Sequence, residues 1–294
     1  GELASRGYQV VILDDLSTGK MENIQALLNK DNVTFVRGSI TELALLQELF
    51  ESVDYLFHQA AMARVPFSIE NPLAVNEVNI SGTLNVLWAA KRSNVKRVIY
   101  ASSSSVYGNT VSLPQREDMP TNPLSPYALT KLTGEYYCNI FREIYALSTV
   151  CLRYFNVYGP RQDPQSQYAT VIPAFIGRVL QDLPPIIHGD GEQTRDFTFV
   201  QDVVEANILA AESNATGIFN IGKGERSSVN NLAELVIRLS GNGNIIKPVH
   251  VEPRVGDLKH SLADISKSSS FGYEPKFSLE EGLKETIRSF RHEE

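Results

Sequence analysis

The chain has 294 residues, which is enough for one large domain or two modest ones with a proper core. Apolar residues make up 43% of it and charged residues 21%, so global disorder is excluded. The net charge of −7 argues against a general nucleic-acid or anionic-membrane surface, and no apolar run is long enough to span a bilayer.

The first half of the chain alternates short apolar runs with helical patterns. Runs without strict alternation suit strands that are buried on both faces, and they lie at 8–14, 33–37, 54–58, 97–101 and 149–155. Apolar spacings between them predict helices over 43–50, 80–90 and 129–140. This alternation predicts an α/β fold with a doubly wound, parallel, Rossmann-type sheet.

After about residue 157 glycine and proline become frequent, and helices are predicted over 169–180, 229–239 and 279–290. We interpret this part as a smaller α/β substrate lobe whose loops cover the carboxyl edge of the sheet, where ligands bind in such folds. The nucleotide-binding domain is expected to span 1–157, with 197–224 returning to it, and the substrate lobe to comprise 158–196 and 225–294.

The two cysteines, Cys138 and Cys151, lie within apolar segments and lack the spacing of metal ligands. We therefore expect two reduced, buried thiols, no bound metal and a cytoplasmic protein.

Asp14 ends the first predicted strand. In parallel-sheet nucleotide binders an acid at the tip of the second strand binds the adenosine ribose hydroxyls, about 20 residues after a glycine-rich turn. A carboxylate there pairs with a free 2′-hydroxyl and repels a 2′-phosphate, which favours NAD over NADP. Counting back from Asp14 leads beyond Gly1, so we expect the first strand and the glycine-rich loop to be missing from this sequence. The alternative is a fold that begins here and needs no dinucleotide.

Tyr127 differs from the other tyrosines because a lysine, Lys131, follows it at a spacing of four. This spacing puts both side chains on one helical face, where an ammonium lowers the pKa of a phenol from about 10. Such a phenol is a usable general base near neutral pH. The pair follows Ser102–Ser105 by a short connection, so the two features can meet at the sheet edge.

Several short segments, each of moderate specificity, occur in one order and spacing. They are LDDLSTG (13–19), HQAA (58–61), NISGT (79–83), SSSSVYG (102–108), SPYALTK (125–131), RYFNVYGPRQ (153–162), GDGEQTRDF (189–197) and RVGDLKHSLADISK (254–267). Over essentially its whole length the chain therefore resembles the extended short-chain dehydrogenases/reductases, specifically the NAD-dependent nucleotide-sugar 4-epimerases of the UDP-glucose and UDP-N-acetylglucosamine group.

The resemblance implies three catalytic residues. Tyr127 would remove the proton of the sugar 4-hydroxyl, Lys131 would lower the pKa of Tyr127 and hold the nicotinamide ribose, and Ser103 would hydrogen-bond the same sugar oxygen. The implied NAD-binding residues are Asp14, Asp15, Ser17, Thr18, Gly19, Ser39, Ile40, Ala60, Ala61, Asn79, Tyr127, Lys131 and Phe155. Ser39 occupies the position where many members carry an aspartate beside the adenine. We therefore expect a weaker contact to the adenine, and no loss of NAD binding.

The resemblance also implies contacts to the UDP-sugar from Ser103, Ser104, Ser105, Tyr127, Asn156, Val171, His188, Arg195, Arg254, Asp257 and Ser261. Arg195 and Arg254 suit a diphosphate because planar guanidinium groups match phosphate oxygens. Ser104 and Ser105 occupy places where sugar dehydratases carry an acid pair, and a serine cannot replace it. A dehydratase and the related decarboxylase are therefore disfavoured.

The implied reaction is NAD-dependent epimerisation at C4 of a UDP-sugar through a 4-keto intermediate. The small side chain of Ser261 points to UDP-N-acetylglucosamine and UDP-N-acetylgalactosamine, with UDP-glucose and UDP-galactose as further substrates. UDP-glucuronate 4-epimerase is the alternative within the family, and a non-catalytic NAD-binding sensor is the alternative of another class. The family also implies a homodimer, joined through a four-helix bundle of the helices around 79–93 and 127–146.

Overall fold

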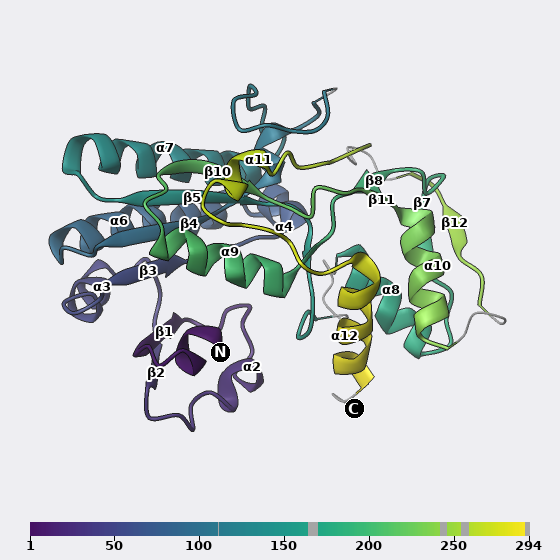
Figure 1. Ribbon diagram of the computed structural model, residues 1–294, viewed down its shortest axis with the longest axis horizontal. Coiled ribbons are helices and arrows are strands. Elements are labelled where there is room, and N and C mark those ends of the chain that lie inside the picture. Colours follow the sequence, from purple (N-terminus) through teal and green to yellow (C-terminus); the bar gives the residue numbers. More distant parts are fainter. Residues whose placement is uncertain (111, 164–169, 242–245, 254–258, 292–294) are drawn as a thin grey trace.

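The computed structural model describes residues 1–110, 112–163, 170–241, 246–253 and 259–291. These residues form an α/β structure in which a parallel sheet carries helices on both faces and a second group of helices lies beside it (Figure 1). In the described part of the chain, no helix combines the length and the apolar character that a membrane span requires.

The central sheet has four parallel strands in the order β10-β5-β4-β3. They are β3 (Tyr55–His58), β4 (Arg97–Ser103), β5 (Thr149–Tyr154) and β10 (Gly217–Ile221). Successive strand residues point to opposite faces, so Val98 and Tyr100 pack into one core cluster and Ile99 into another. Because both faces are covered, β4 is an unbroken apolar run over most of its length, as predicted.

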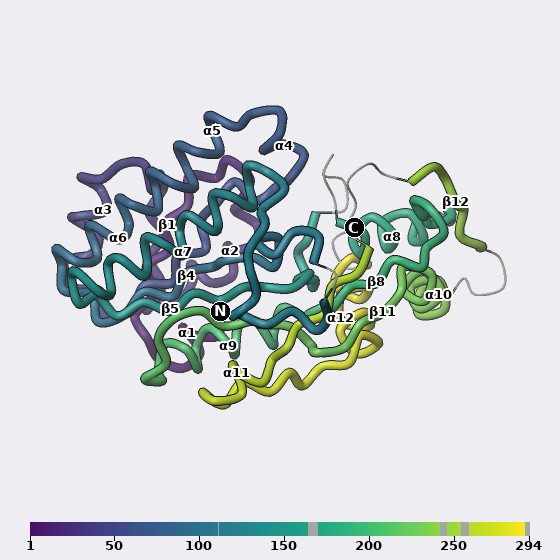
Figure 2. The backbone as a smooth tube through the Cα atoms, turned by 90° about the horizontal axis from the view of Figure 1, so that it is seen from above, coloured from purple at the N-terminus to yellow at the C-terminus, as the bar shows by residue number. Residues whose placement is uncertain are grey.

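Long helices cover the two faces of this sheet (Figure 1). One face packs against α3 (Leu43–Leu49), α6 (Thr83–Arg92) and α7 (Pro126–Tyr145), and the other packs against α9 (Val200–Glu212). Figure 2 shows α6 and α7 running side by side, and the two helices are in contact. The short helical elements are α1 (Glu2–Ser5), α2 (Glu22–Gln25), α4 (Val65–Glu70), α5 (Pro72–Asn76), α11 (Ser266–Ser269), a π-helical segment η1 (Glu77–Gly82) and a 3-10 turn η2 (Ser104–Tyr107).

Strands β1 (Val10–Asp14) and β2 (Val33–Arg37) form a parallel pair of their own. The prediction had placed them in the same sheet as the other strands, and here the described structure differs from it. A cavity of about 970 Å³ lies between β1 and β3 and is lined by both strands. Among the described strands, β1 and β3 are therefore not hydrogen-bonded neighbours.

The second group of elements has its own apolar core, which is formed by α8 (Val171–Leu180), α10 (Val229–Leu239) and α12 (Leu279–Arg291). This group contains two short strand pairs, β7 (Ile186–His188) with β12 (Val249–Val251) and β8 (Thr194–Arg195) with β11 (Ser227–Ser228). A third pair, β6 (Val157–Tyr158) with β9 (Thr198–Phe199), lies where the chain passes between the two groups. We propose this group as the predicted substrate lobe. The helix α11 is an exception to the predicted bounds, because it packs against β10 of the central sheet.

Candidate active site

Helix α7 carries the Tyr127–Lys131 pair, and a capping residue fixes where it begins. Ser125 is extended and its Oγ accepts a hydrogen bond from the Ala128 N–H at 3.1 Å. Pro126 occupies the first turn, where an N–H would have no helical partner. Tyr127 therefore lies in the first turn of α7, and the Ser125 cap fixes the position of this turn.

Ser103 is the last residue of β4 and lies at the start of the turn η2. Its Oγ accepts hydrogen bonds from Ser105 N at 3.2 Å and from Ser105 Oγ at 2.9 Å. The turn η2 is in contact with α7, and Ser103 is close enough to the Tyr127 side chain to lower the pKa of its phenol. The four consecutive serines thus belong to regular elements, the end of β4 and the start of η2.

Lys131 is buried one helical turn beyond Tyr127. Its Nζ donates to the Ala101 carbonyl at 2.7 Å and lies 5.1 Å from the centroid of the Tyr100 ring. Burial lowers the pKa of Lys131 to about 8. Nearby, burial and the Lys131 charge lower the pKa of His58 to about 3, so this imidazole is neutral at physiological pH.

The phenol of Tyr127 departs from the sequence prediction. We predicted that the Lys131 charge would lower its pKa, but burial raises the pKa of Tyr127, and hydrogen bonding to Ser103 opposes this rise. The Lys131 ammonium is directed at the Ala101 carbonyl, and removal of water from the phenol dominates. In the protein alone Tyr127 is therefore held as the neutral phenol at pH 7.

The cavity between β1 and β3 gathers most of the predicted cofactor residues. They are Asp14, Asp15, Ser17, Thr18, Gly19, Ser39, Ile40, Ala60 and Ala61. The Asp14 carboxylate ends β1 and accepts a hydrogen bond from Leu16 N at 2.7 Å. A Cβ at Gly19 would stand 3.0 Å from Asp14 Oδ2, so a larger residue there would require the carboxylate to shift by a few tenths of an ångström. An acid in a cradle of small residues fits the ribose end of a dinucleotide.

Besides Tyr127 and Lys131, two cofactor candidates lie outside this lining. Asn79 is buried, and its amide exchanges hydrogen bonds with both main-chain groups of Met62, at 2.8 and 3.1 Å, while its Nδ2 also donates to Thr130 on α7. It thereby ties the loop after Ala61 to the helix that carries Tyr127. Phe155 is fully buried behind η2, with its ring 6.3 Å from that of Tyr107.

Three of the predicted sugar residues lie close together around the main chain of residues 194–196, here called the 194–196 junction. They are Asn156, Arg195 and Ser261. Asn156 Nδ2 donates to Ser261 Oγ at 3.2 Å and to the Asp196 carbonyl at 3.1 Å. Arg195 Nη1 donates to the Thr194 carbonyl at 3.0 Å. The Asp196 carboxylate accepts from the N–H groups of residues 223, 224 and 263, so it joins three loops, and burial raises its pKa to about 6.

The remaining sugar candidates are less closely grouped. Val171 begins α8, and His188 ends β7 with its Nδ1 3.1 Å from the Glu252 carbonyl. Arg254 and Asp257 lie outside the described residues.

Sequence reasoning missed three buried ionisable groups that support this site, namely Glu135, Arg153 and Asp196. Glu135 follows Lys131 at a further spacing of four and accepts two hydrogen bonds from Arg153. The continued spacing of four was a usable signal, because it places Glu135 on the same helical face as Tyr127 and Lys131. Asp196 gave no such signal, because its partners are main-chain groups.

Comparison with known families identifies the chain. A family model described as the NAD dependent epimerase/dehydratase family matches residues 1–222. The chain belongs to this family. It is an enzyme, and its cofactor is NAD, which the residues around the cavity fit. The predicted parallel α/β fold is confirmed by solved structures of the family.

Relatives of this chain are named for different sugars. It is 38% identical over 294 residues to a UDP-glucose 4-epimerase of Mycolicibacterium smegmatis, covering 99% of this chain and 93% of the relative. A UDP-N-acetylglucosamine 4-epimerase from Methanobrevibacter ruminantium, solved with UDP-N-acetylmuramic acid, is 42% identical with a TM-score of 0.94, covering 97% and 91%. A UDP-glucuronic acid 4-epimerase from Bacillus cereus, solved with UDP-glucuronic acid and NAD, is 33% identical with a TM-score of 0.91, covering 99% and 94%.

Proposed function

We propose that this enzyme inverts C4 of a UDP-sugar, with UDP-N-acetylglucosamine and UDP-N-acetylgalactosamine as its substrates. The observation that carries the proposal is the meeting of Ser103 and Tyr127 at the carboxyl end of β4, with Lys131 one turn away. When bound, NAD accepts a hydride from C4 and returns it, and its positively charged ring favours the phenolate of a neighbouring tyrosine.

The side chains of this protein move and hold the proton. Tyr127 takes the proton of the sugar 4-hydroxyl, and Ser103 hydrogen-bonds the same oxygen while the carbonyl forms. Lys131, one turn beyond Tyr127 and with its ammonium held by the Ala101 carbonyl, binds the nicotinamide ribose in this proposal. The 4-keto sugar then turns in the pocket so that the opposite face of C4 is open to the returning hydride. Tyr127 returns the proton to the C4 oxygen, which completes the inverted sugar.

Ser261 supports the assignment of an N-acetylated sugar. Its side chain is small and 4% exposed, and it is held by Asn156 next to the 194–196 junction, which carries Arg195. If the sugar binds beside Ser261, a bulky side chain there would take up room that an N-acetyl group needs. Ser104 and Ser105 support an epimerase over a dehydratase, because neither can act as an acid at neutral pH.

We also propose that two copies pair through α7. Its outward face carries Leu129, Tyr136, Ile140 and Ile144, of which Tyr136 is 61% and Ile144 is 69% exposed. Spacings of seven and four put these side chains on one stripe of the helix, the pattern of a bundle seam. Size-exclusion chromatography with light scattering should give a dimer, and charging the stripe with Ile140→Glu should give a monomer.

The test of function is a panel of UDP-sugars offered separately to the NAD-loaded protein, with products resolved by chromatography. We expect UDP-N-acetylgalactosamine from UDP-N-acetylglucosamine, and slower conversion of UDP-glucose. Conversion of UDP-glucuronate alone would overturn the argument from Ser261. No product from any sugar, at full NAD occupancy, would reject an epimerase and leave an NAD-binding sensor.

A further inference from the structure

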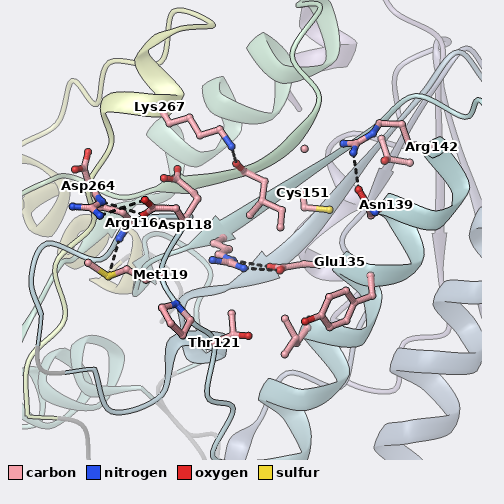
Figure 3. Close-up of a pocket in the computed structure, with 18 of the residues that line it drawn as sticks. Arg116, Asp118, Met119, Thr121, Glu135, Asn139, Arg142, Cys151, Asp264 and Lys267 are labelled. Atoms are coloured by element: carbon pink, nitrogen blue, oxygen red, sulfur yellow. Dashed lines mark hydrogen bonds and ion pairs between the residues drawn. The ribbon is translucent and has the colours of Figure 1, made fainter.

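A buried ion pair lies behind the catalytic serine, where no chemistry is assigned. Arg153 on β5 and Glu135 on α7 have side chains that are only 3% and 2% exposed. Arg153 Nε donates to Glu135 Oε1 at 2.8 Å and Nη2 donates to Oε2 at 2.7 Å, which is a bidentate pair. Figure 3 shows the two dashed contacts to Glu135 at the inner side of a cavity of about 760 Å³.

The ion pair contacts both ends of the segment 102–107, which contains Ser103. Glu135 Oε1 also accepts a hydrogen bond from Ser102 Oγ, the residue before Ser103. The guanidinium of Arg153 lies over the ring of Tyr107, 4.6 Å from its centroid, at the other end of the segment. Tyr107 is itself anchored, because its hydroxyl donates to Asn220 Oδ1 at 2.7 Å.

Helix α7 is bonded to strand β4 at a second point, through Lys131. Lys131 donates to the carbonyl of Ala101, and Glu135 accepts from the side chain of Ser102, so α7 is bonded to two consecutive residues of β4. The ladder between β4 and β5 places Ser102 opposite Arg153, which fixes the pair in register with the strand. The position of Ser103 relative to Tyr127 therefore depends on Glu135.

We infer that Glu135 is a positioning residue of the reaction, which acts with Arg153 through Ser102 and Tyr107 to hold Ser103 against Tyr127. The inference rests on the proposed function. A buried bidentate pair is a costly way to obtain stability alone, because well-packed apolar side chains often do as well. It does, however, fix direction and distance, and an error of about 1 Å in a reacting group can lower a rate about 10²-fold.

The first variant is Ser102→Ala, which removes one link and leaves the Glu135–Arg153 pair intact. We expect kcat to fall about 3- to 10-fold, with little change in KM or NAD affinity. The rise of kcat/KM with pH should move to higher pH, because a displaced Ser103 no longer stabilises the Tyr127 phenolate. The matched control is Ser268→Ala, a fully buried serine whose hydroxyl donates to the Ile265 carbonyl, and it should match the wild type.

The second variant, Glu135→Leu with Arg153→Met, replaces the pair by apolar side chains of similar size. It should retain the melting temperature and NAD binding but lose kcat about 10²-fold. If both variants keep kcat within about twofold of an active wild type, with an unchanged pH profile, the pair is structural only and the inference is wrong. An inactive wild type would reject the proposed function, and this inference with it.

Discussion

His58 makes the stability of this protein depend on pH, in a direction that its surroundings define. Its side chain is 3% exposed, and Nε2 lies 2.9 Å from Thr83 Oγ1. Burial and the neighbouring Lys131 charge lower its pKa from 6.5 to about 3 in the folded protein. Below pH 6.5 the unfolded chain therefore takes up a proton that the folded protein refuses. The neutral imidazole contributes stability above pH 6.5, and this contribution is lost as the pH falls toward 3.

The size of the effect follows from the two pKa values. Between pH 7 and pH 4 the folded imidazole stays mostly neutral, whereas the unfolded one becomes protonated, which costs about 3 kcal/mol of unfolding free energy. Urea titrations from pH 7 to pH 4 should show this loss in the wild type, and His58→Gln should lose about 3 kcal/mol less over the same range. The exposed His250 provides a control, His250→Gln, that should follow the wild type. Parallel curves for His58→Gln and the wild type would refute the reasoning.

Three substitutions test the assigned roles in the reaction. Tyr127→Phe should bind NAD normally in a fluorescence titration and lose kcat about 10²- to 10⁴-fold, so normal turnover would mean that the base is another residue. Ser103→Ala should cost about 10²-fold in kcat, more than Ser102→Ala; equal losses would remove the distinction between a catalytic and a supporting serine. Ser261→Tyr should lower kcat/KM for UDP-N-acetylglucosamine relative to UDP-glucose at least about tenfold, and an unchanged ratio would exclude Ser261 from sugar selection.

Most of the parallel strands could be predicted, because buried parallel strands are continuous apolar runs in a sequence. The run at 33–37 became β2 without a change of bounds, and 97–101 became β4, which continues to Ser103. Helix α9 was not predicted, since small residues such as Ala206, Ala210 and Ala211 fill much of its buried face and give a weak apolar pattern. Strand β10 was missed as well, because Gly217 and Asn220 leave only three apolar residues in its five-residue segment.

The candidate site shows a different limit. The spacing of Tyr127 and Lys131 was visible along the chain because a helix repeats locally. The pairing of Glu135 with Arg153 could not be predicted. It depends on which residues of β4 and β5 lie opposite each other, and the strand register cannot be read from the sequence alone. The raised pKa of Tyr127 was missed for a related reason: the lysine is four residues away in sequence, but the loss of water depends on the whole fold.

The central claim is that this enzyme inverts C4 by removing and returning the same hydride. The most direct measurement uses UDP-N-acetylglucosamine with deuterium at C4, incubated in ordinary water with the NAD-loaded protein and followed by NMR. The account predicts UDP-N-acetylgalactosamine that keeps its deuterium at C4. Product that has exchanged C4 deuterium for solvent hydrogen would contradict it.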